Sequence, residues 1–545
     1  MANGGSVVVD WMRRSGLTHF FNVPGESFLP VLDALRDEDG IRLVTNRHES
    51  GASFAAEAFA KVSGQPAVCM ATRGPGASNL SIGVQTAFYD STPMVALLGL
   101  VPTNLRDSRA FQEFDPASLF QSISKGVLVA DTVAELPALL ADSLRLATTG
   151  RPGPVVVGLP SDVLYAETSD VAGSAPASLE TVRADVGPVL DLLESAEHPV
   201  LIAATGAVRA QAADDLATFA AATGLPVFTA WRRYSAFDNG HPNFVGPLGL
   251  GMTPAVKAVL ARADLVVCVG FIEQITAQQA GLGRHGQTVV QVAPDTDATL
   301  PRHLGEARFV QVVGDTTGAA ADLAGWLATN PDHAAALHAR HAEATGAAVL
   351  AARMPAGQAR GEGVHLDFFI SRMNELVQPD AIVTSDAGNF AQWLLRYFRF
   401  DKSRAYAGPL NGAMGYGLPA AIGANLAAPG RPAWCVAGDG GLLMTIGEME
   451  TATRLGVNAT VVIVNNEAYG TIRARQFAEY PDRLTGTDLG PVDFARAAAS
   501  MGWSSRRVHN DAEVDAALVE ACGDPGRRLI EVLVDRVPLG LDGAG

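Results

Sequence analysis

The sequence predicts an α/β protein that contains three doubly wound domains, each with a parallel sheet. Strand-like apolar runs alternate with helical patterns along almost the whole chain, and two segments of different character interrupt this alternation. Most of the runs are continuously apolar, which is typical of strands buried on both faces. Strands separated by helices form βαβ units with parallel sheets. The length of 545 residues also exceeds what a single hydrophobic core supports.

The predicted strands share a short apolar core and a turn or helix signal at each end. In chain order they are 18–23, 41–45, 66–71, 94–99, 154–159, 199–204, 265–270, 288–293, 381–385, 433–438, 460–466 and 529–534.

Two segments divide this pattern into three blocks. Residues 167–185 are small and polar without strong periodicity, and residues 330–365 read as an Ala-rich helix followed by a Gly/Pro loop. We interpret both as linkers, because domain boundaries fall in such stretches. The predicted domains are 1–168, 186–330 and 360–545.

The net charge of −17 argues against a nucleic-acid partner, because neutralising phosphates requires a basic face. It argues equally against an anionic membrane surface, but a local pocket can still receive a small anion.

No window holds 18 uncharged apolar residues, so no membrane span is expected. The N-terminus lacks a signal-peptide pattern. The four cysteines form no CxxC pair and are expected to be buried free thiols. We therefore expect a cytoplasmic enzyme.

Residues 433–466 predict a strand–helix–strand crossover. The helix is indicated by apolar positions at helical spacing and a terminating glycine; these are Leu442, Ile446, Met449, Thr453 and Gly456. Crossovers are right-handed and their two strands parallel, so both carboxyl ends meet at one edge of the sheet. Open α/β sheets bind ligands at that edge.

The crossover brings Asp439 and Asn466 to the same edge. A carboxylate, an amide oxygen and a nearby carbonyl are hard donors that suit Mg²⁺, which completes its shell with phosphate oxygens. Gly440 and Gly441 allow close backbone approach at a helix start, where free N–H groups attract phosphate. The sequence therefore predicts a metal ion clamped to a diphosphate.

The pattern "GDG", 24 residues and "NN" resembles the motif of thiamine-diphosphate-dependent enzymes. The resemblance implies that Asp439, Asn466 and the backbone of Ala468 hold Mg²⁺. It covers the whole chain in the order of the pyruvate-oxidase and acetolactate-synthase branch. That order is a pyrimidine-binding domain, a middle domain and a diphosphate-binding domain.

In "RHE", Glu49 follows a predicted strand and begins a predicted helix that Gly64 ends. The resemblance makes Glu49 the carboxylic acid that drives the cofactor's aminopyrimidine into its imino form, so that C2 of the thiazolium loses a proton. An apolar setting would let a glutamate share a proton near neutrality. In the family this glutamate comes from a neighbouring subunit, which implies at least a homodimer, and a homotetramer is expected.

Other cofactor contacts follow from family motifs. "TRGPGASN" (72–79) resembles a glycine turn, in which Ser78 and Asn79 are possible helix caps. "NGAMGYG" resembles the pyrimidine-contacting loop, with Met414 as the apolar residue that bends the cofactor. The full expected set is Gly25, Gly74, Gly388, Asn389, Gly412, Met414, Gly438, Asp439, Gly440, Gly441, Asn466 and Tyr469.

The nearest resemblance is to acetolactate synthases. "AFQE" implies that Phe111 and Gln112 contact the reacting substrate. Three positions depart from the synthase pattern: Ser161 stands for a lysine, Ile272 for a carboxylate-binding arginine and Arg475 for a tryptophan of the acceptor pocket. Ser161 and Arg475 remain candidate substrate contacts, and Arg475 could receive an acidic substrate.

We therefore expect a lyase or carboligase that decarboxylates a 2-oxo acid and transfers the acyl-anion unit to a carbonyl acceptor. The alternatives are a simple 2-oxo acid decarboxylase, a 2-hydroxyacyl-CoA lyase, or a non-catalytic cofactor-binding subunit. The middle domain binds FAD in synthases; no GxGxxG directly follows a predicted strand in this domain, so an empty nucleotide fold is favoured over bound FAD.

Overall fold

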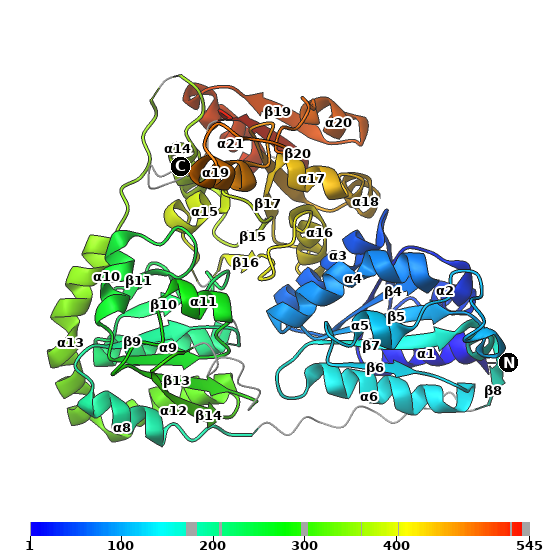
Figure 1. Ribbon diagram of the computed structural model, residues 1–545, viewed down its shortest axis with the longest axis horizontal. Coiled ribbons are helices and arrows are strands. Elements are labelled where there is room, and N and C mark those ends of the chain that lie inside the picture. The colour runs from blue at the N-terminus through cyan, green and yellow to red at the C-terminus, as the bar shows by residue number, and fades with distance from the viewer. Residues whose placement is uncertain are drawn as a thin grey trace.

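The computed structural model describes residues 2–169, 182–206, 210–295, 304–360, 362–401, 403–523 and 526–536. Three six-stranded parallel sheets lie within the three predicted domain ranges, which confirms the predicted fold class (Figure 1). Most of the linker predicted at 167–185 lies outside the described residues. No helix in the described part of the chain is long and apolar enough to span a membrane.

The N-terminal sheet has the strand order β3-β2-β4-β5-β7-β6. Its strands are β2 (His19–Asn22), β3 (Arg42–Thr45), β4 (Ala67–Thr72), β5 (Met94–Leu100), β6 (Gly126–Val129) and β7 (Pro154–Pro160). The helices are α1 (Gly4–Arg14), α2 (Leu29–Arg36), α3 (Glu49–Ser63), α4 (Arg73–Asp90), α5 (Pro116–Phe120), α6 (Leu136–Thr148) and α7 (Ser161–Tyr165). A two-stranded antiparallel pair, β1 (Ala2–Asn3) with β8 (Glu167–Thr168), joins the two ends of this domain.

The middle sheet has the order β11-β10-β9-β12-β13-β14, which is the dinucleotide-binding topology. Its strands are β9 (Pro199–Ala203), β10 (Val227–Thr229), β11 (Phe244–Pro247), β12 (Leu265–Val269), β13 (Thr288–Ala293) and β14 (Arg308–Val313). The helices are α8 (Gly187–Ser195), α9 (Ala210–Thr223), α10 (Pro254–Arg262), α11 (Gln274–Gln279), α12 (Thr316–Thr329) and α13 (Pro331–Ala352).

Helix α13 corrects part of the linker prediction for 330–365. It packs against α9 and α10 on the outer side of the middle domain (Figure 1). Thr345 donates a 2.7 Å hydrogen bond to the carbonyl of Gly224, and Leu337 is buried. Only the stretch after Ala352 connects the domains, because the preceding helix carries a buried face.

The C-terminal sheet has the order β16-β15-β17-β18-β20-β19. Its strands are β15 (Ile382–Ser385), β16 (Ala405–Ala407), β17 (Ala433–Gly438), β18 (Ala459–Asn465), β19 (Ser504–Val508) and β20 (Arg527–Leu533). The helices are α14 (Leu366–Leu376), α15 (Ala391–Tyr397), α16 (Gly417–Ala427), α17 (Asp439–Thr445), α18 (Glu448–Leu455), α19 (Gly470–Glu479), α20 (Phe494–Ser500) and α21 (Val514–Gly523). The single helix predicted between β17 and β18 is two helices, and Gly456 ends the second with a φ of 69°.

The N- and C-terminal sheets share one topology, because each places its six strands in the order 2-1-3-4-6-5. Helices α3 and α16 occupy equivalent places, after the second strand, and they pack against each other (Figure 1). The approach is close: a Cβ on Gly423 would lie 2.0 Å from the carbonyl oxygen of Ala55. The N- and C-terminal domains therefore meet through equivalent helices.

Candidate active site

Two parallel strands of the C-terminal sheet end beside each other at the predicted metal edge. β17 and β18 pair in register up to Gly438 and Val464. Asp439 begins α17 directly after β17, and Asn466 follows β18. The crossover prediction is confirmed, and the two side chains start from adjacent strand ends.

Asp439 presents a buried carboxylate with one unused oxygen. Its Oδ1 accepts a 2.8 Å hydrogen bond from the backbone N–H of Gly440, whereas Oδ2 is buried without any partner. Burial is the main cause that raises the pKa of Asp439, and backbone N–H groups of Glu467 and Ala468 oppose this shift. A buried carboxylate oxygen is costly without a partner. A divalent cation would supply one, so this residue fits the expected metal.

The turn after β18 supplies the other oxygens. Asn466 Oδ1 accepts from the backbone N–H of Ala468 at 3.2 Å, and the carbonyl of Ala468 accepts from Gly470 at 2.8 Å. Glu467 has a φ of 51°, a left-handed conformation that is unusual outside glycine. No group of three or more His, Cys, Asp or Glu side chains could hold a metal anywhere in the described residues. One carboxylate, one amide and one carbonyl are thus the candidate ligands.

Four glycines at this sheet edge lie in close contact with side chains of neighbouring loops. A Cβ on Gly440 would lie 2.7 Å from the ring of Tyr469, and a Cβ on Gly441 would lie 2.3 Å from Oδ2 of Asp386. Cβ atoms on Gly388 and Gly438 would lie 2.4 Å and 3.2 Å from the ring of Phe390. Larger residues would displace these neighbours, so glycine is required where the loops meet.

Asp386 was not among the predicted site residues, although it lies in the quoted loop "TSDAGNF". It is buried after β15 and accepts a 2.8 Å hydrogen bond from the backbone N–H of Gly417. Its Oδ2 has no partner, and burial is the main cause that raises its pKa to about 6. Asp386 therefore joins the loop after β15 to the start of α16.

Glu49 is the first residue of α3, at the carboxyl edge of the N-terminal sheet. Asn79 donates a hydrogen bond from Nδ2 to Oε2 of Glu49 at 3.0 Å, and Gly76 lies against the other carboxylate oxygen. The prediction that Ser78 and Asn79 cap a helix is wrong, because α4 already begins at Arg73. Asn79 therefore points from the second turn of α4 to the carboxylate, a role the motif did not reveal.

Two further predicted residues meet beside Glu49. The backbone N–H of Gly74 donates a 2.9 Å hydrogen bond to the carbonyl of Gln112, so the glycine turn and the "AFQE" loop are joined. Gly25 lies against Thr72, since a Cβ at position 25 would lie 2.3 Å from the Cβ of Thr72. These contacts gather the N-terminal candidate residues at one sheet edge.

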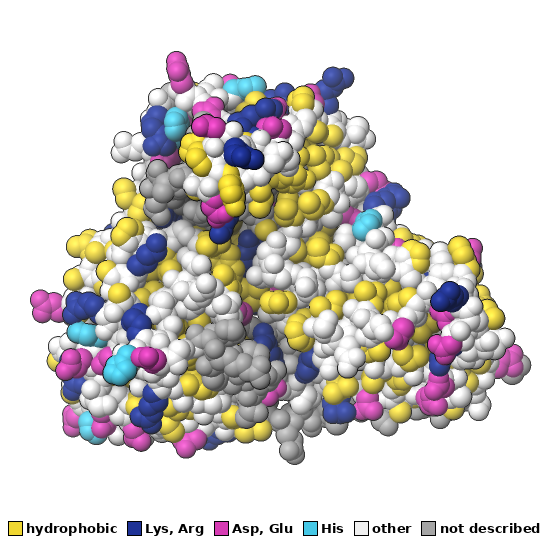
Figure 2. Space-filling view, viewed as in Figure 1, with side chains coloured by type: hydrophobic (Ala, Val, Ile, Leu, Met, Phe, Trp, Pro, Cys, Tyr) yellow, Lys and Arg dark blue, Asp and Glu magenta, His cyan; other side chains and the backbone are white. Residues whose placement is uncertain are grey.

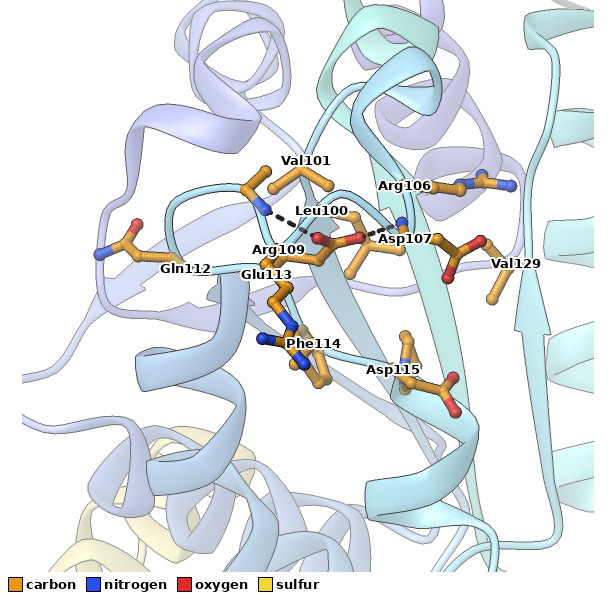
Figure 3. A pocket seen from close by; sticks show the side chains of 12 residues that line it. Leu100, Val101, Arg106, Asp107, Arg109, Gln112, Glu113, Phe114, Asp115 and Val129 are labelled. Atoms are coloured by element: carbon orange, nitrogen blue, oxygen red, sulfur yellow. Dashed lines mark hydrogen bonds between the residues drawn. The ribbon is translucent and has the colours of Figure 1, made fainter.

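The "AFQE" loop borders a cavity of ≈ 670 Å³ (Figure 3). Three non-glycine residues of the loop are left-handed: Asp107, Arg109 and Gln112, with φ of 61°, 58° and 64°. Glu113 pins the loop by accepting hydrogen bonds from the backbone N–H groups of Asp107 at 2.5 Å and Ala110 at 2.8 Å. Sparsely populated backbone conformations concentrate at functional sites.

Side chains of this loop are open to solvent. Phe111 is 79% exposed, which is unusual for a phenylalanine. The amide of Gln112 points away from the other side chains that line the cavity (Figure 3). Both residues are thus presented outward from the sheet edge, where a ligand or a second chain could cover them.

The diverged residues lie in different places. Ser161 is buried at the start of α7, directly after β7. Ile272 is buried in the middle domain, where its N–H donates to Gln291. Arg475 lies on α19 with a side chain 78% exposed, and it forms a 2.7 Å ion pair with Glu479. Among these three, only Ser161 shares the N-terminal sheet edge with the Glu49 candidates.

Met414 and Gly412 lie in the irregular segment before α16. Gly412 is exposed with a φ of 72°, and Met414 is half-buried. Asn389 lies in the loop between β15 and α15 and is half-buried. Each of these loops borders the same edge of the C-terminal sheet.

Glu448 links the two halves within one chain. At the start of α18 it accepts hydrogen bonds from the backbone N–H groups of Arg47 and His48 at 3.0 and 3.1 Å, and from Asn46 Nδ2 at 2.9 Å. Burial raises its pKa. This carboxylate fixes the loop that leads into Glu49 against the C-terminal domain.

The described part of the middle-domain crevice contains several polar contacts. It would open between β9 and β12, where the strand order reverses. Thr205 and Phe271 bridge it through two backbone hydrogen bonds of 3.1 and 2.8 Å. The Thr205 hydroxyl there donates to the half-buried Glu273 carboxylate and accepts from the buried Arg233 guanidinium. The Arg151 guanidinium lies 4.9 Å from the centre of the Phe271 ring. Residues 207–209 and 296–303 lie outside the described residues.

Fold and site together are those of an α/β protein with candidate cofactor-binding residues at the carboxyl edges of two sheets. Three family models match the chain: the N-terminal thiamine pyrophosphate binding domain over residues 2–119, the central domain over 186–323 and the C-terminal binding domain over 386–532. The chain therefore belongs to the thiamine pyrophosphate enzymes.

Curated relatives place it on one branch of that family. It is 32% identical to the acetolactate synthase large subunit of Corynebacterium glutamicum over 552 residues, which cover 95% of this chain and 84% of the relative. It is 30% identical to isozyme 1 of the Escherichia coli acetolactate synthase large subunit over 557 residues, covering 98% and 94%. The acetolactate synthase of Mycobacterium bovis is 30% identical over 541 residues, covering 94% and 84%. The chain lies on the acetolactate-synthase branch.

Proposed function

We propose that the protein is a thiamine-diphosphate-dependent lyase or carboligase that acts on a 2-oxo acid and passes the acyl-anion unit to a carbonyl acceptor. The observation that carries this proposal is the buried, unpartnered Oδ2 of Asp439 at the sheet edge that also holds Asn466. Such an atom is costly without a partner, and a divalent cation would supply one.

The residues present fit Mg²⁺ and the diphosphate. Asp439, Asn466 and the carbonyl of Ala468 would hold the ion, which matches its preference for oxygen ligands. Free N–H groups at the start of α17, with Gly440 and Gly441, would receive the phosphate oxygens. Bound thiamine diphosphate supplies the electron sink that stabilises a carbanion next to the former carbonyl.

The chain's own residues would orient and activate the cofactor. Glu49 would exchange a proton with the aminopyrimidine nitrogen, held in place by Asn79. Met414, which is half-buried in the loop before α16, would supply an apolar contact to the cofactor. Gln112 and Phe111 would contact the substrate from the neighbouring loop, because Gly74 ties that loop to the Glu49 edge. Ser161 and Arg475 remain proposed substrate contacts.

We also propose that the protein forms at least a homodimer, and that two such dimers assemble into a homotetramer. Apolar side chains are exposed on α4, α17 and α19; they are Ile82, Tyr89, Leu443, Met444, Ile472 and Phe477. Figure 2 shows apolar side chains gathered on the C-terminal domain around α17. Since α4 and α17 each follow the third strand of their sheet, a second chain can repeat the α3–α16 type of contact there. The expected cytoplasmic location is part of the same proposal.

The test is carbon dioxide release from a panel of 2-oxo acids, with and without aldehyde or 2-oxo acid acceptors. We expect release that needs both Mg²⁺ and thiamine diphosphate, and a ligated product when an acceptor is present. Aldehyde alone would favour the simple decarboxylase, and activity only with a CoA thioester would favour the 2-hydroxyacyl-CoA lyase. Turnover that ignores chelator and cofactor would contradict the proposal.

A further inference from the structure

The segment 408–417, called here the cofactor loop, has little regular structure of its own. It connects β16 to α16 and contains Gly412 and Gly415, whose φ values are 72° and 80°. Within the loop, the backbone N–H of Gly412 donates to the carbonyl of Pro409 at 3.1 Å. Thr445 of α17 donates to the carbonyl of Gly415 at 2.8 Å. A loop built this way needs further anchors to hold Met414 in one place.

The N-terminal domain anchors the first half of the cofactor loop. Lys61 Nζ donates to the carbonyl of Gly408 at 3.1 Å, and Asp90 Oδ2 accepts from the N–H of Leu410 at 3.1 Å. The Asn411 amide donates to the hydroxyl of Thr86 at 3.0 Å. A neighbouring domain thus satisfies polar groups that the loop cannot satisfy itself.

Glu57 anchors the second half. It is fully buried on α3, and its Oε2 accepts a 2.6 Å hydrogen bond from the hydroxyl of Tyr416. Its Oε1 accepts from Thr92 at 2.7 Å and lies 2.9 Å from Lys61 Nζ. Burial is the main cause that raises the pKa of Glu57, and Lys61 opposes it. A hydrogen bond to a buried carboxylate is among the stronger kinds, so it fixes the tyrosine firmly.

The tyrosine ring is seated as firmly as its hydroxyl. Its centre lies 5.4 Å from that of Phe54 in an edge-on arrangement, and Ala413 and Ala58 belong to the same buried cluster. The residues on both sides of Met414 are therefore packed on α3, while Met414 itself stays half-buried. This arrangement leaves the methionine as the part of the loop that can meet a ligand.

The middle domain completes the anchor. Arg233 Nη2 lies 2.9 Å from Asp90 Oδ1, and Asp90 also lies 3.1 Å from Lys61. These charges are buried, so removing one partner would leave another uncompensated. The group formed by Glu57, Lys61, Asp90 and Arg233 thus joins all three domains behind the cofactor loop.

We propose that Glu57 and Tyr416 are positioning residues for cofactor binding, which act through Met414 by fixing the cofactor loop on α3. This inference rests on the proposed function, because Met414 must contact the cofactor. The sequence pattern gives no hint of it, since Glu57 stands alone in an alanine-rich helix.

A double-mutant cycle tests the inference. Tyr416→Phe, Met414→Ala and the double variant are compared for the thiamine diphosphate dissociation constant at saturating Mg²⁺, from quenching of tryptophan fluorescence. We expect each single substitution to raise the dissociation constant roughly tenfold. The dissociation constant of the double variant should not exceed the higher of the two single-variant values, because both changes remove the same support. Glu57→Gln, which keeps an oxygen acceptor for the tyrosine, should weaken binding less than Tyr416→Phe.

The control separates positioning from general stability. Thr345→Val removes a buried hydrogen bond in the middle domain, and it should lower the melting temperature without changing the dissociation constant. The inference would be overturned if the fold-changes of the two single variants multiplied in the double variant. It would also be overturned if Tyr416→Phe bound thiamine diphosphate with wild-type affinity. A wild-type protein that binds no thiamine diphosphate would instead overturn the proposed function.

Discussion

Asn79 and Glu49 are joined across two adjacent helices by a 3.0 Å hydrogen bond from the amide Nδ2 to the carboxylate Oε2. Asn79 lies on α4 and Glu49 begins α3. The amide is a neutral donor, so it fixes the direction of the carboxylate without placing a second charge beside it. The structure therefore gives Glu49 an orientation as well as a place at the sheet edge.

Asn79→Ala should slow exchange of the cofactor C2 proton and lower kcat roughly tenfold, because the Glu49 side chain then samples unproductive rotamers. The measurement is hydrogen–deuterium exchange at C2 by quenched-flow NMR. Glu49→Gln should abolish exchange while the cofactor still binds, and adding Asn79→Ala to it should change nothing further. Equal exchange in Asn79→Ala and wild type would contradict the assigned role.

Asp439→Ala should remove Mg²⁺-dependent binding of thiamine diphosphate, because it deletes the buried carboxylate oxygen that lacks a partner in the protein. Isothermal titration with and without Mg²⁺ measures the effect, and chelation of wild-type protein should reproduce it. Asp488→Asn is a matched control, since Asp488 is exposed and pairs only with Arg473 among the described ion pairs. A metal-dependent affinity that survives in Asp439→Ala would refute the ligand assignment.

The sequence predicts the metal edge well and the contacts between domains poorly. All twelve predicted strands are present, and the two strand ends that carry Asp439 and Asn466 follow from the crossover rule. The strands that were not predicted include the edge strands β6, β14 and β19. All three are only partly buried. Polar residues interrupt β14 and β19, whereas the apolar run of β6 is only four residues long.

Long-range polar contacts could not be predicted for a different reason. Glu448 reaches the loop before Glu49, and Glu57 reaches Tyr416 from 359 residues away in the chain. Local spacing carries no information about such partners, because they depend on how α3 and α16 dock. The error at Asn79 is of the same kind: a residue that suits a helix cap is used inside the helix for a contact between helices.

Glu113→Gln should raise KM for the 2-oxo acid severalfold with a smaller change in stability. Each carboxylate oxygen of Glu113 accepts from one backbone N–H of a loop with three left-handed residues, and in Gln one of these oxygens is replaced by an NH2 group that cannot accept. Without the second anchor, Gln112 and Phe111 lose their fixed presentation. Asp115→Asn, which weakens the cap of α5 in the same loop, serves as the comparison. An unchanged KM in Glu113→Gln would show that the strained loop does not position substrate.

The burial of Asp386 should make the free energy of unfolding of the cofactor-free protein depend on pH. Burial raises its pKa from 3.8 to about 6, so the folded state favours the protonated acid. The corresponding stability is fully present below about pH 4 and is lost as the pH rises to about 6, a change on the order of 3 kcal/mol. Asp386→Asn should not lose this increment. Urea unfolding of both proteins between pH 4 and pH 7 measures the difference, and parallel curves would contradict the prediction.

Mixing two inactive variants tests whether Glu49 and Asp439 act across a subunit boundary. Glu49→Gln and Asp439→Ala should each be inactive as homodimers. A mixed dimer has one site with both substitutions and one site with neither, if each site takes the glutamate from one chain and the metal ligands from the other. After equal mixing and reassociation, about one quarter of wild-type activity per chain should return. If both groups acted within one chain, each site would keep one lesion and no activity would return at any mixing ratio.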